Sequence, residues 1–215
     1  MDHADLLAEL RLSQQRAEVA LAFMADADAR GPSLLPGWTR GHLITHLARN
    51  ADGLNRLAAG AIAGEPAEMY PGGPPAREAA IAEGADRPLS LLAADFHFAG
   101  RRVVQTIGQL GPDALDTPVA WRRVVPAREV AMLRWRELEV HLVDLGLDYQ
   151  ISDWPESFVE LTLAAELPTL GSLGQDIAVP DIDRPDLLAW LLGRPTSGDL
   201  PPLPALPPWP FDSPS

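Results

Sequence analysis

The residues best suited to chemistry lie in the segment RWRELEVHLVDLG at positions 134–146. Glu137 and His141 are four residues apart, which places both on one side of a helix, on the same stripe as Val130 and Leu133. This apolar stripe should face the interior of a protein. A carboxylate in that position must be paired, hydrogen-bonded or bound to a metal, because burying it alone is costly.

Two interpretations of this pair stay open on spacing alone. In the first, Glu137 contacts His141 one turn away, or forms an ion pair with Arg134 or Arg40. In the second, His46 on another helix reaches the same point. Two imidazole nitrogens and one carboxylate oxygen, with a fourth position open, are a ligand set of catalytic zinc.

Other polar residues near these positions leave further questions open. His42 lies one turn before His46, and spacing does not decide which of the two histidines would be the ligand. Asp144 follows His141 by three residues on the same side of the helix. It is a candidate to hold the ring of His141 by a hydrogen bond, and the alternative is a plain acid at a helix end.

Four long helices are expected to position these side chains. Apolar residues recur at helical spacing in 4–28, in the segment from Thr39 to about Gly60, in 89–110 and in 126–145. Thr39 is suited to cap the start of the second helix, and a glycine at position 146 is suited to end the fourth. Four helices of about twenty residues predict a bundle.

The segment EPAEMYPGGPPAREAAIAEGADRP at 65–88, between the second and third helices, is rich in Pro and Gly. We interpret it as a long functional loop, in which AREAAIAEG could form a short helix. On sequence alone, Arg77 in this segment is interpreted as a surface charge of the loop.

The composition changes after the fourth helix, so we predict a bundle domain at 1–148 and a smaller region at 149–215. In the second region we expect a helix after Pro155, a strand at 175–179 (QDIAV) and a helix around DLLAWLLG. Eight of the 22 prolines lie in the last 21 residues, which predicts an extended tail. The small region is therefore predicted to be α+β.

Composition and charge exclude several classes of function. The net charge of −13 argues against a nucleic-acid partner, and an anionic substrate would need local arginines. No apolar run is long enough to span a membrane, and acids stand near the N-terminus where a signal peptide is basic, so a cytoplasmic location is expected. Cysteine is absent, so thiol chemistry would need a thiol from outside the chain.

Four runs in the order LLPGWTRGHLITHLARNADGL, MYPGGPPAREAAIAEGADRP, RWRELEVHLVDLG and LLAWLLGR span nearly the whole chain. Together they resemble the mycothiol-dependent maleylpyruvate isomerases, a branch of the DinB-like metal-binding bundles. The resemblance implies a mainly α fold: a DinB-like four-helix bundle with a small C-terminal α+β lid region, which is shortened in this chain. It also implies zinc ligands at His46, Glu137 and His141, with His42 outside the ligand set, and active-site arginines at Arg77 and Arg194.

The activity implied by the resemblance is a cis–trans isomerisation that uses zinc and mycothiol as cofactors. The thiolate would add to the cis double bond of maleylpyruvate, allow rotation, and leave to give fumarylpyruvate. The partners would be a small anionic substrate and a low-molecular-weight thiol, with no nucleic acid and no membrane. The alternatives are a mycothiol S-transferase acting on other electrophiles and a non-catalytic bundle. Neighbouring genes for gentisate oxidation, in aromatic degradation, would favour the isomerase.

Overall fold

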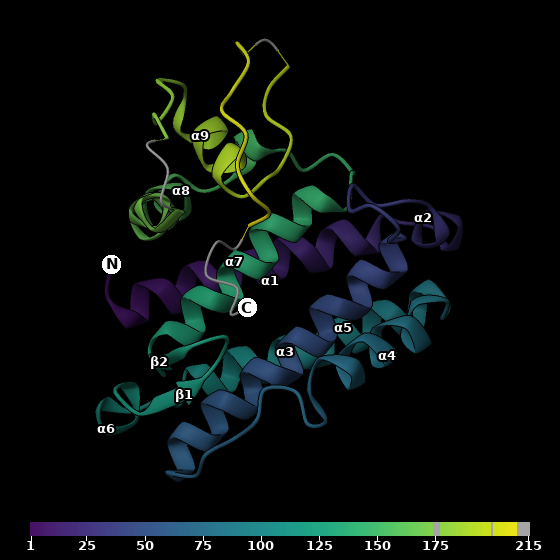
Figure 1. The fold of residues 1–215 in the computed structure, drawn as a ribbon. Helices are drawn as coiled ribbons and strands as arrows, with labels where there is room; N and C mark the ends of the chain where they lie inside the picture. The colour runs from purple at the N-terminus through teal and green to yellow at the C-terminus, as the bar shows by residue number, and fades with distance from the viewer. Residues whose placement is uncertain (174–176, 199, 210–215) are drawn as a thin grey trace. The chain divides into compact units, whose positions relative to one another are not determined.

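The computed structural model describes residues 1–173, 177–198 and 200–209. The chain divides into two compact units, Met1–Leu147 and Asp148–Ser215. The first unit is built around four long helices (Figure 1). These are α1 (His3–Ala22), α3 (Arg40–Ala63), α5 (Leu89–Ile107) and α7 (Glu129–Asp144). The predicted mainly helical fold is confirmed.

The ends of these helices follow local sequence signals. Thr39 caps α3, because its side chain accepts a hydrogen bond from the backbone N–H of His42. Gly146 follows the end of α7 with φ 62°, a left-handed conformation that glycine adopts at low cost. The prediction of one helix over 4–28 is wrong at its end: α1 stops at Ala22, and a separate short helix, α2 (Asp26–Arg30), follows.

The core lies between the four long helices, where α1 packs on α5 and α7, and α3 packs on the same two helices. The largest fully buried apolar side chains of this unit include Leu10, Leu43, Ile44, Leu47, Leu54, Leu57, Leu92, Phe96, Ile107 and Trp135. Burial of such side chains supplies most of the driving force for helix packing. In the described part of the chain, no helix is both long and apolar enough to cross a membrane.

A buried carboxylate joins α7 to α1 on the side that faces the core. Glu139 is fully buried, and its Oε1 accepts hydrogen bonds from Ser13 Oγ at 2.7 Å, Arg16 Nη2 at 2.5 Å and Trp135 Nε1 at 3.1 Å. Such a set of donors offsets the cost of removing the charge from water. Glu139, two residues after Glu137, therefore holds α7 against α1.

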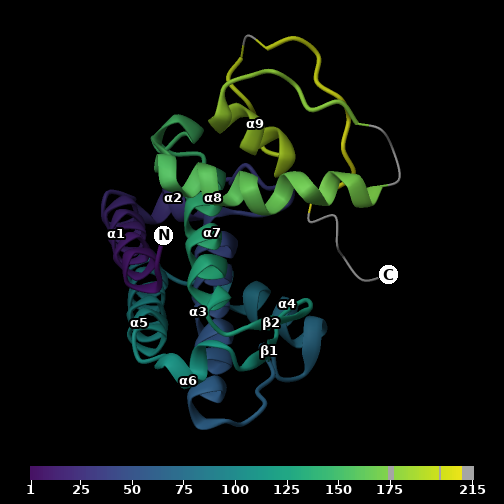
Figure 2. The same ribbon diagram turned by 90° about the vertical axis from the view of Figure 1, so that its left-hand side faces the viewer.

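Shorter elements cover the opposite side of the α3–α7 pair. Figure 2 shows α4 (Gly73–Ala85) and a hairpin of β1 (Pro118–Ala120) and β2 (Val124–Pro126) on this side, with α1 and α5 on the other. The strands are antiparallel, with Val119 opposite Val125, and α6 (Pro112–Leu115) precedes them. The hairpin was not predicted.

The interpretation of 65–88 as a long loop is wrong in its second half, where α4 forms. Its prolines stand in the first turn, where the backbone N–H groups have no partner inside the helix, so they do not interrupt it. Gly72, with φ 83°, turns the chain into this helix. The short helix suggested for AREAAIAEG is thus confirmed and begins earlier than expected.

Gly41 allows α3 to approach the end of α4, and replacing it should destabilise the bundle. A methyl group at this position would lie well inside contact distance of the Ala85 carbonyl oxygen and 3.3 Å from that of Ala29. We expect Gly41→Ala to lower the free energy of unfolding by about 1–3 kcal/mol, measured by urea titration. Gly111→Ala is the control, with open space around the site and φ −75°, and should change it by less than about 0.5 kcal/mol. Equal stability of the two variants would contradict this expectation.

The second unit contains helices and irregular segments in its described residues. Its helices are α8 (Glu156–Glu166) and α9 (Arg184–Leu191), with 3-10 turns η1 (Ile151–Asp153) and η2 (Leu167–Leu173). The predicted helices are confirmed, but the strand at 175–179 is wrong for 177–179, which form no strand, while 175–176 lie outside the described residues. A strand needs a hydrogen-bonded neighbour, and no described segment of this unit supplies one. The predicted α+β description of this unit is therefore wrong for its described residues, which are helical or irregular.

An extended tail is predicted for the last 21 residues, and its described parts, 195–198 and 200–209, have no helix or strand. It is held against its own unit by two tryptophans. Trp190 Nε1 donates to the carbonyl oxygen of Pro204 at 2.8 Å, and Trp209 Nε1 donates to Glu166 Oε2 at 2.9 Å. The remaining residues of the predicted tail, 199 and 210–215, lie outside the described residues.

Candidate metal centre

The start of α3 separates the roles of its two histidines. His42 Nδ1 lies 2.7 Å from Thr39 Oγ1, so the ring of His42 takes part in the cap of the helix. His46 is one turn further along, only 5% exposed, and points toward α7. Spacing left both histidines open as ligands, and the structure brings His46 to Glu137 and His141.

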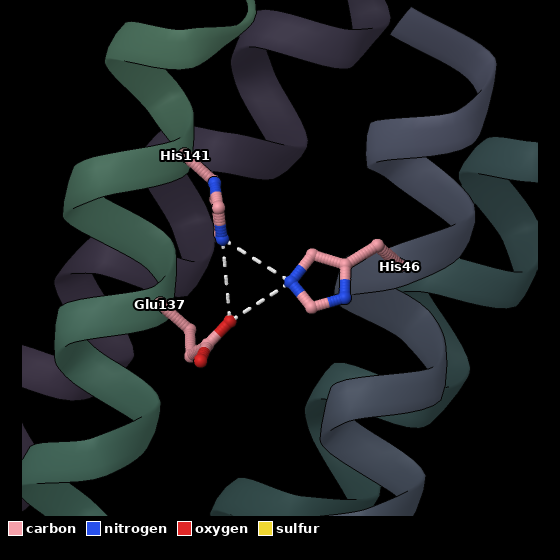
Figure 3. A group of neighbouring side chains, drawn as sticks. All are labelled: His46, Glu137 and His141. Carbon is pink, nitrogen blue, oxygen red and sulfur yellow. Dashed lines mark hydrogen bonds and ion pairs between the residues drawn. The ribbon is translucent and has the colours of Figure 1, made fainter. Parts of the chain in front are cut away.

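Figure 3 shows His46, Glu137 and His141 converging from α3 and α7. His46 Nε2 lies 3.0 Å from Glu137 Oε2 and 3.1 Å from His141 Nε2, and the latter two atoms are 3.4 Å apart. Ligand atoms of a tetrahedral zinc ion, each about 2.0–2.2 Å from the metal, lie roughly 3.3–3.6 Å from one another. The three atoms are therefore spaced closely enough for one small metal ion to hold them together.

Asp144 orients the ring of His141 from behind. Its Oδ2 lies 2.8 Å from His141 Nδ1, and the carboxylate is almost completely buried, with 1% of Asp144 exposed. A carboxylate accepts the Nδ1 hydrogen, which leaves Nε2 with its lone pair toward Glu137 and His46. Asp144 therefore contacts the candidate ligand His141, and it is not merely an acid at a helix end.

The electrostatics of the site favour the ligand forms of two of these groups. Burial lowers the pKa of His46 from 6.5 to about 4, although the hydrogen bond to Glu137 opposes this shift. Burial would raise the pKa of Glu137, but hydrogen bonds with His141 and His46 hold that pKa well below its usual value. A neutral imidazole and an ionised carboxylate are the states that a metal requires.

The arginines that could have neutralised Glu137 are engaged elsewhere. Arg134 is fully buried and donates to the Leu47 carbonyl oxygen at 2.9 Å and to Asn50 Oδ1 at 3.0 Å. Arg40 donates to the carbonyl oxygens of Leu145 and Gly146, beyond the end of α7. The simple ion-pair interpretation therefore does not describe Glu137, whose neighbours are the two histidines.

Arg77 reaches the cluster from α4. Its Nη2 lies 3.0 Å from His46 Nδ1, and since an arginine only donates, Nδ1 accepts in this arrangement. Its Cζ lies 5.5 Å from the centroid of the Tyr70 ring, within the range of a cation–π contact. The cluster thus has a cationic group at its edge, as a site for an anionic substrate would need.

Arg194 belongs to the second unit and follows α9. Gly193 has φ 64°, the N–H of Arg194 donates to the carbonyl oxygen of Ala189 at 2.8 Å, and its Nη1 donates to that of Leu192 at 2.7 Å. The side chain is half-buried at the C-terminal end of a helix, where a cation is favourable. Its role in a site remains a prediction.

Sequence reasoning missed two side chains near the cluster. Arg77 Cζ lies 5.5 Å from the centroid of the Tyr70 ring, and Trp38 packs edge-on against His46 with ring centroids 5.6 Å apart. Tyr70 and Trp38 stand outside regular elements, where periodicity gives no signal.

The fold and the site together define a helical-bundle protein with a candidate metal centre between two of its long helices. The family of the mycothiol maleylpyruvate isomerase N-terminal domain matches residues 10–146, and the chain belongs to this family. No curated protein sequence matches it.

Two solved structures are similar over almost their whole length. One is a crystal structure of the mycothiol-dependent maleylpyruvate isomerase, with a TM-score of 0.87 and 29% sequence identity. The other is a histidine-to-alanine mutant of that enzyme, with a TM-score of 0.86 and 29% identity. Each comparison covers 97% of this chain and 98% of the other.

Proposed function

We propose that the protein is a cis–trans isomerase that converts maleylpyruvate into fumarylpyruvate with the help of zinc and mycothiol. The observation that carries this proposal is the convergence of His46, Glu137 and His141 at one point of a bundle of this family. The similar crystal structures are those of an enzyme with this activity in its name. A reaction that depends on a reduced thiol is expected in the cytoplasm.

In this proposal His46, Glu137 and His141 hold the zinc ion, and Asp144 fixes the ring of His141. Zinc with an open coordination position would bind an external thiol and favour its thiolate near neutral pH. The chain itself has no cysteine that could serve as a nucleophile. His141 contributes no proton to the reaction here, because its Nε2 would be a ligand and its Nδ1 is hydrogen-bonded to Asp144.

The proposed reaction balances without a redox partner. A carbon–sulfur bond forms as the thiolate adds to the cis double bond, and the electron pair moves to the conjugated carbonyl oxygen as an enolate. Rotation about the resulting single bond is followed by the reverse step, which expels the thiolate and restores the double bond in the trans form. Arg77 would donate hydrogen bonds to the substrate carboxylate or to the enolate oxygen, where negative charge increases during addition.

The same pairing of zinc and thiol could instead conjugate mycothiol to other electrophiles. Both activities can be measured with one zinc-loaded preparation, using maleylpyruvate in one assay and an α-haloketone in the other. An isomerase returns its thiol after each turnover, so the free thiol concentration should stay constant while fumarylpyruvate accumulates. Consumption of mycothiol by the haloketone without isomerisation of maleylpyruvate would refute the isomerase and support the transferase.

Arg77 and Arg194 would bind the substrate carboxylates, and their loss should reduce catalysis and leave the metal in place. One charge-assisted hydrogen-bonded contact contributes about 1.5–3 kcal/mol, or roughly 10- to 150-fold in kcat/KM. We expect Arg77→Ala and Arg194→Ala to show this loss with full zinc content. Arg→Lys should recover only part of it, because the planar fork is missing.

Maleylpyruvate kinetics and zinc analysis of the same preparations check this prediction. If Arg194→Ala has wild-type kinetics, Arg194 of the second unit does not bind the substrate. That result would favour the S-transferase. Loss of zinc in Arg77→Ala would mean that the contact with His46 supports the metal centre instead of the substrate.

A further inference from the structure

The loop between α2 and α3, residues 31–39, places an aromatic ring against one of the candidate ligands. The indole of Trp38 packs edge-on against the ring of His46, with ring centroids 5.6 Å apart and planes inclined by 61°. The same indole stacks on the ring of His42, at 6.2 Å and 27°. Among the described residues, its N–H group has no hydrogen-bond partner, so the side chain acts here through its aromatic surface.

The backbone of this loop is closed on itself by hydrogen bonds. Pro32 and Thr39 form an antiparallel bridge, and the N–H and the Oγ of Ser33 both donate to the carbonyl oxygen of Trp38 at 2.9 Å. The N–H of Trp38 donates in turn to the carbonyl oxygen of Leu35 at 3.1 Å. Both backbone groups of Trp38 are thus bonded inside the loop, which fixes the point from which the indole extends.

The loop also joins the two helices that carry the candidate ligands. The N–H of Leu34 donates to the carbonyl oxygen of Asp144, at the end of α7, at 2.8 Å. The side chain of Asp144 is the one that lies 2.8 Å from His141 Nδ1. At its other end the loop leads directly into α3, which carries His46. The place of Trp38 is therefore set relative to both helices, close to the two histidines.

The two histidines differ in what holds their rings. His141 has a carboxylate at Nδ1, the usual second partner of an imidazole that binds a metal. The neighbour of His46 Nδ1 is a guanidinium nitrogen of Arg77, 3.0 Å away, and no carboxylate or carbonyl oxygen of the described residues hydrogen-bonds to that nitrogen. The indole of Trp38 is the aromatic ring that packs on His46 from outside α3 and α7, and such packing limits rotation of the imidazole.

We propose that Trp38 is a positioning residue, which holds the imidazole of His46 with Nε2 directed toward Glu137 and His141. The inference rests on the metal binding that the proposed function gives to these three residues. Trp38 supplies no ligand atom, so its loss should leave three ligands in place and make one of them less well ordered. A metal would then bind more weakly, because ordering the ligand costs free energy at the moment of binding.

The test compares Trp38→Phe, which keeps an aromatic ring, with Trp38→Met and Trp38→Leu, which do not. Leu34→Ala is the matched control, because it changes the same loop at a side chain that is 50% exposed and lies beside Gly146. The Kd for zinc is measured by competition with a chelator of known affinity. The visible absorption spectrum of each protein loaded with Co²⁺ reports the geometry of the ligands, and urea unfolding of the metal-free proteins measures their stability.

We expect Trp38→Met and Trp38→Leu to weaken zinc binding about 3- to 10-fold, the range expected for loss of one aromatic contact. The Co²⁺ spectra of both should differ from that of wild type. Trp38→Phe should bind zinc within about 2-fold of wild type and recover the spectrum, since a phenyl ring can also pack edge-on against an imidazole. Leu34→Ala should match wild type in both measurements.

Wild-type zinc affinity and Co²⁺ spectra in the non-aromatic variants would overturn the inference. Equal weakening by Trp38→Phe and Trp38→Met would also overturn it, since the aromatic ring would then not matter. Equal weakening by Leu34→Ala would do the same, because the effect would belong to the loop as a whole. If one of the two non-aromatic variants does not fold, the other decides.

The proposed function and the role of Trp38 can fail separately. Failure of zinc-loaded wild type to isomerise maleylpyruvate would refute the proposed function alone, because the measurements on Trp38 need no turnover. If wild type binds neither zinc nor Co²⁺, or if His46→Ala binds them equally well, both proposals fall together with the metal centre.

Discussion

Replacing His46, Glu137 or His141 by alanine should remove bound zinc and abolish isomerisation. Each residue contributes one of the three atoms that lie within 3.4 Å of one another, and no described neighbour offers a substitute ligand at that point. Loss of a residue that merely supports a ligand weakens metal binding about 10- to 100-fold, so loss of a ligand should exceed that range. Metal analysis of purified protein, together with competition against a chelator of known affinity, measures the effect.

His42→Ala is the control for this series, because it removes an imidazole one turn from His46 without touching the cluster. His42 takes part in the cap of α3, and its loss should lower stability by about 0.5–1 kcal/mol while zinc stays bound. If the zinc content of this variant falls as far as in His46→Ala, the assignment of the ligands is wrong. A lower melting temperature with full zinc content is the expected result.

Isomerisation should also depend on an added thiol, with negligible turnover by the zinc-loaded protein alone. A chain without cysteine offers no thiolate of its own. A free thiol with a pKa near 8.5 is only about 3% ionised at pH 7, so a metal that keeps it deprotonated raises the concentration of the nucleophile roughly 30-fold before any effect of positioning. We expect the rate to increase more than about 100-fold when mycothiol is supplied. The appearance of fumarylpyruvate measures this rate.

Two controls separate this effect from the reaction of thiols in solution. Mycothiol with His46→Ala, or with protein stripped of metal, should give only the background rate. Mycothiol should also be recovered unchanged after many turnovers. Comparable isomerisation by the wild type in the absence of any thiol would contradict the mechanism, whatever the metal content.

The helical positions of the cluster could be predicted because α3 and α7 are strongly periodic. Spacing places Glu137 and His141 on one face, and Thr39 and Gly146 mark helix ends that the structure confirms. The choice between His42 and His46 required tertiary information. A capping histidine and a buried one look alike in sequence, and only the packing of α7 against α3 brings His46 to Glu137.

The elements beside the bundle were harder to predict, because they depend on neighbours distant in sequence. Prolines suggested a loop at 65–88, yet in the first turn of α4 they fit the helix, and that helix brings Arg77 to His46. The family resemblance indicated Arg77, but the position of Arg77 along the chain gave no sign of a functional role. The short hairpin at Val119 and Val125 buries one residue of each strand, too little for a period-two pattern to appear.

The buried contact of Glu139 with α1 has a consequence for how a metal would enter. Because α7 is fastened to Ser13 and Arg16 on its far side, the backbone that carries two of the three candidate ligands is ordered by the folding of the bundle. The conformational entropy of these ligands is then lost during folding, and little remains to be lost when an ion arrives. A metal site whose ligands are ordered by folding would select ions by size and preferred geometry, and an ion could leave and return while the surrounding helices stay in place.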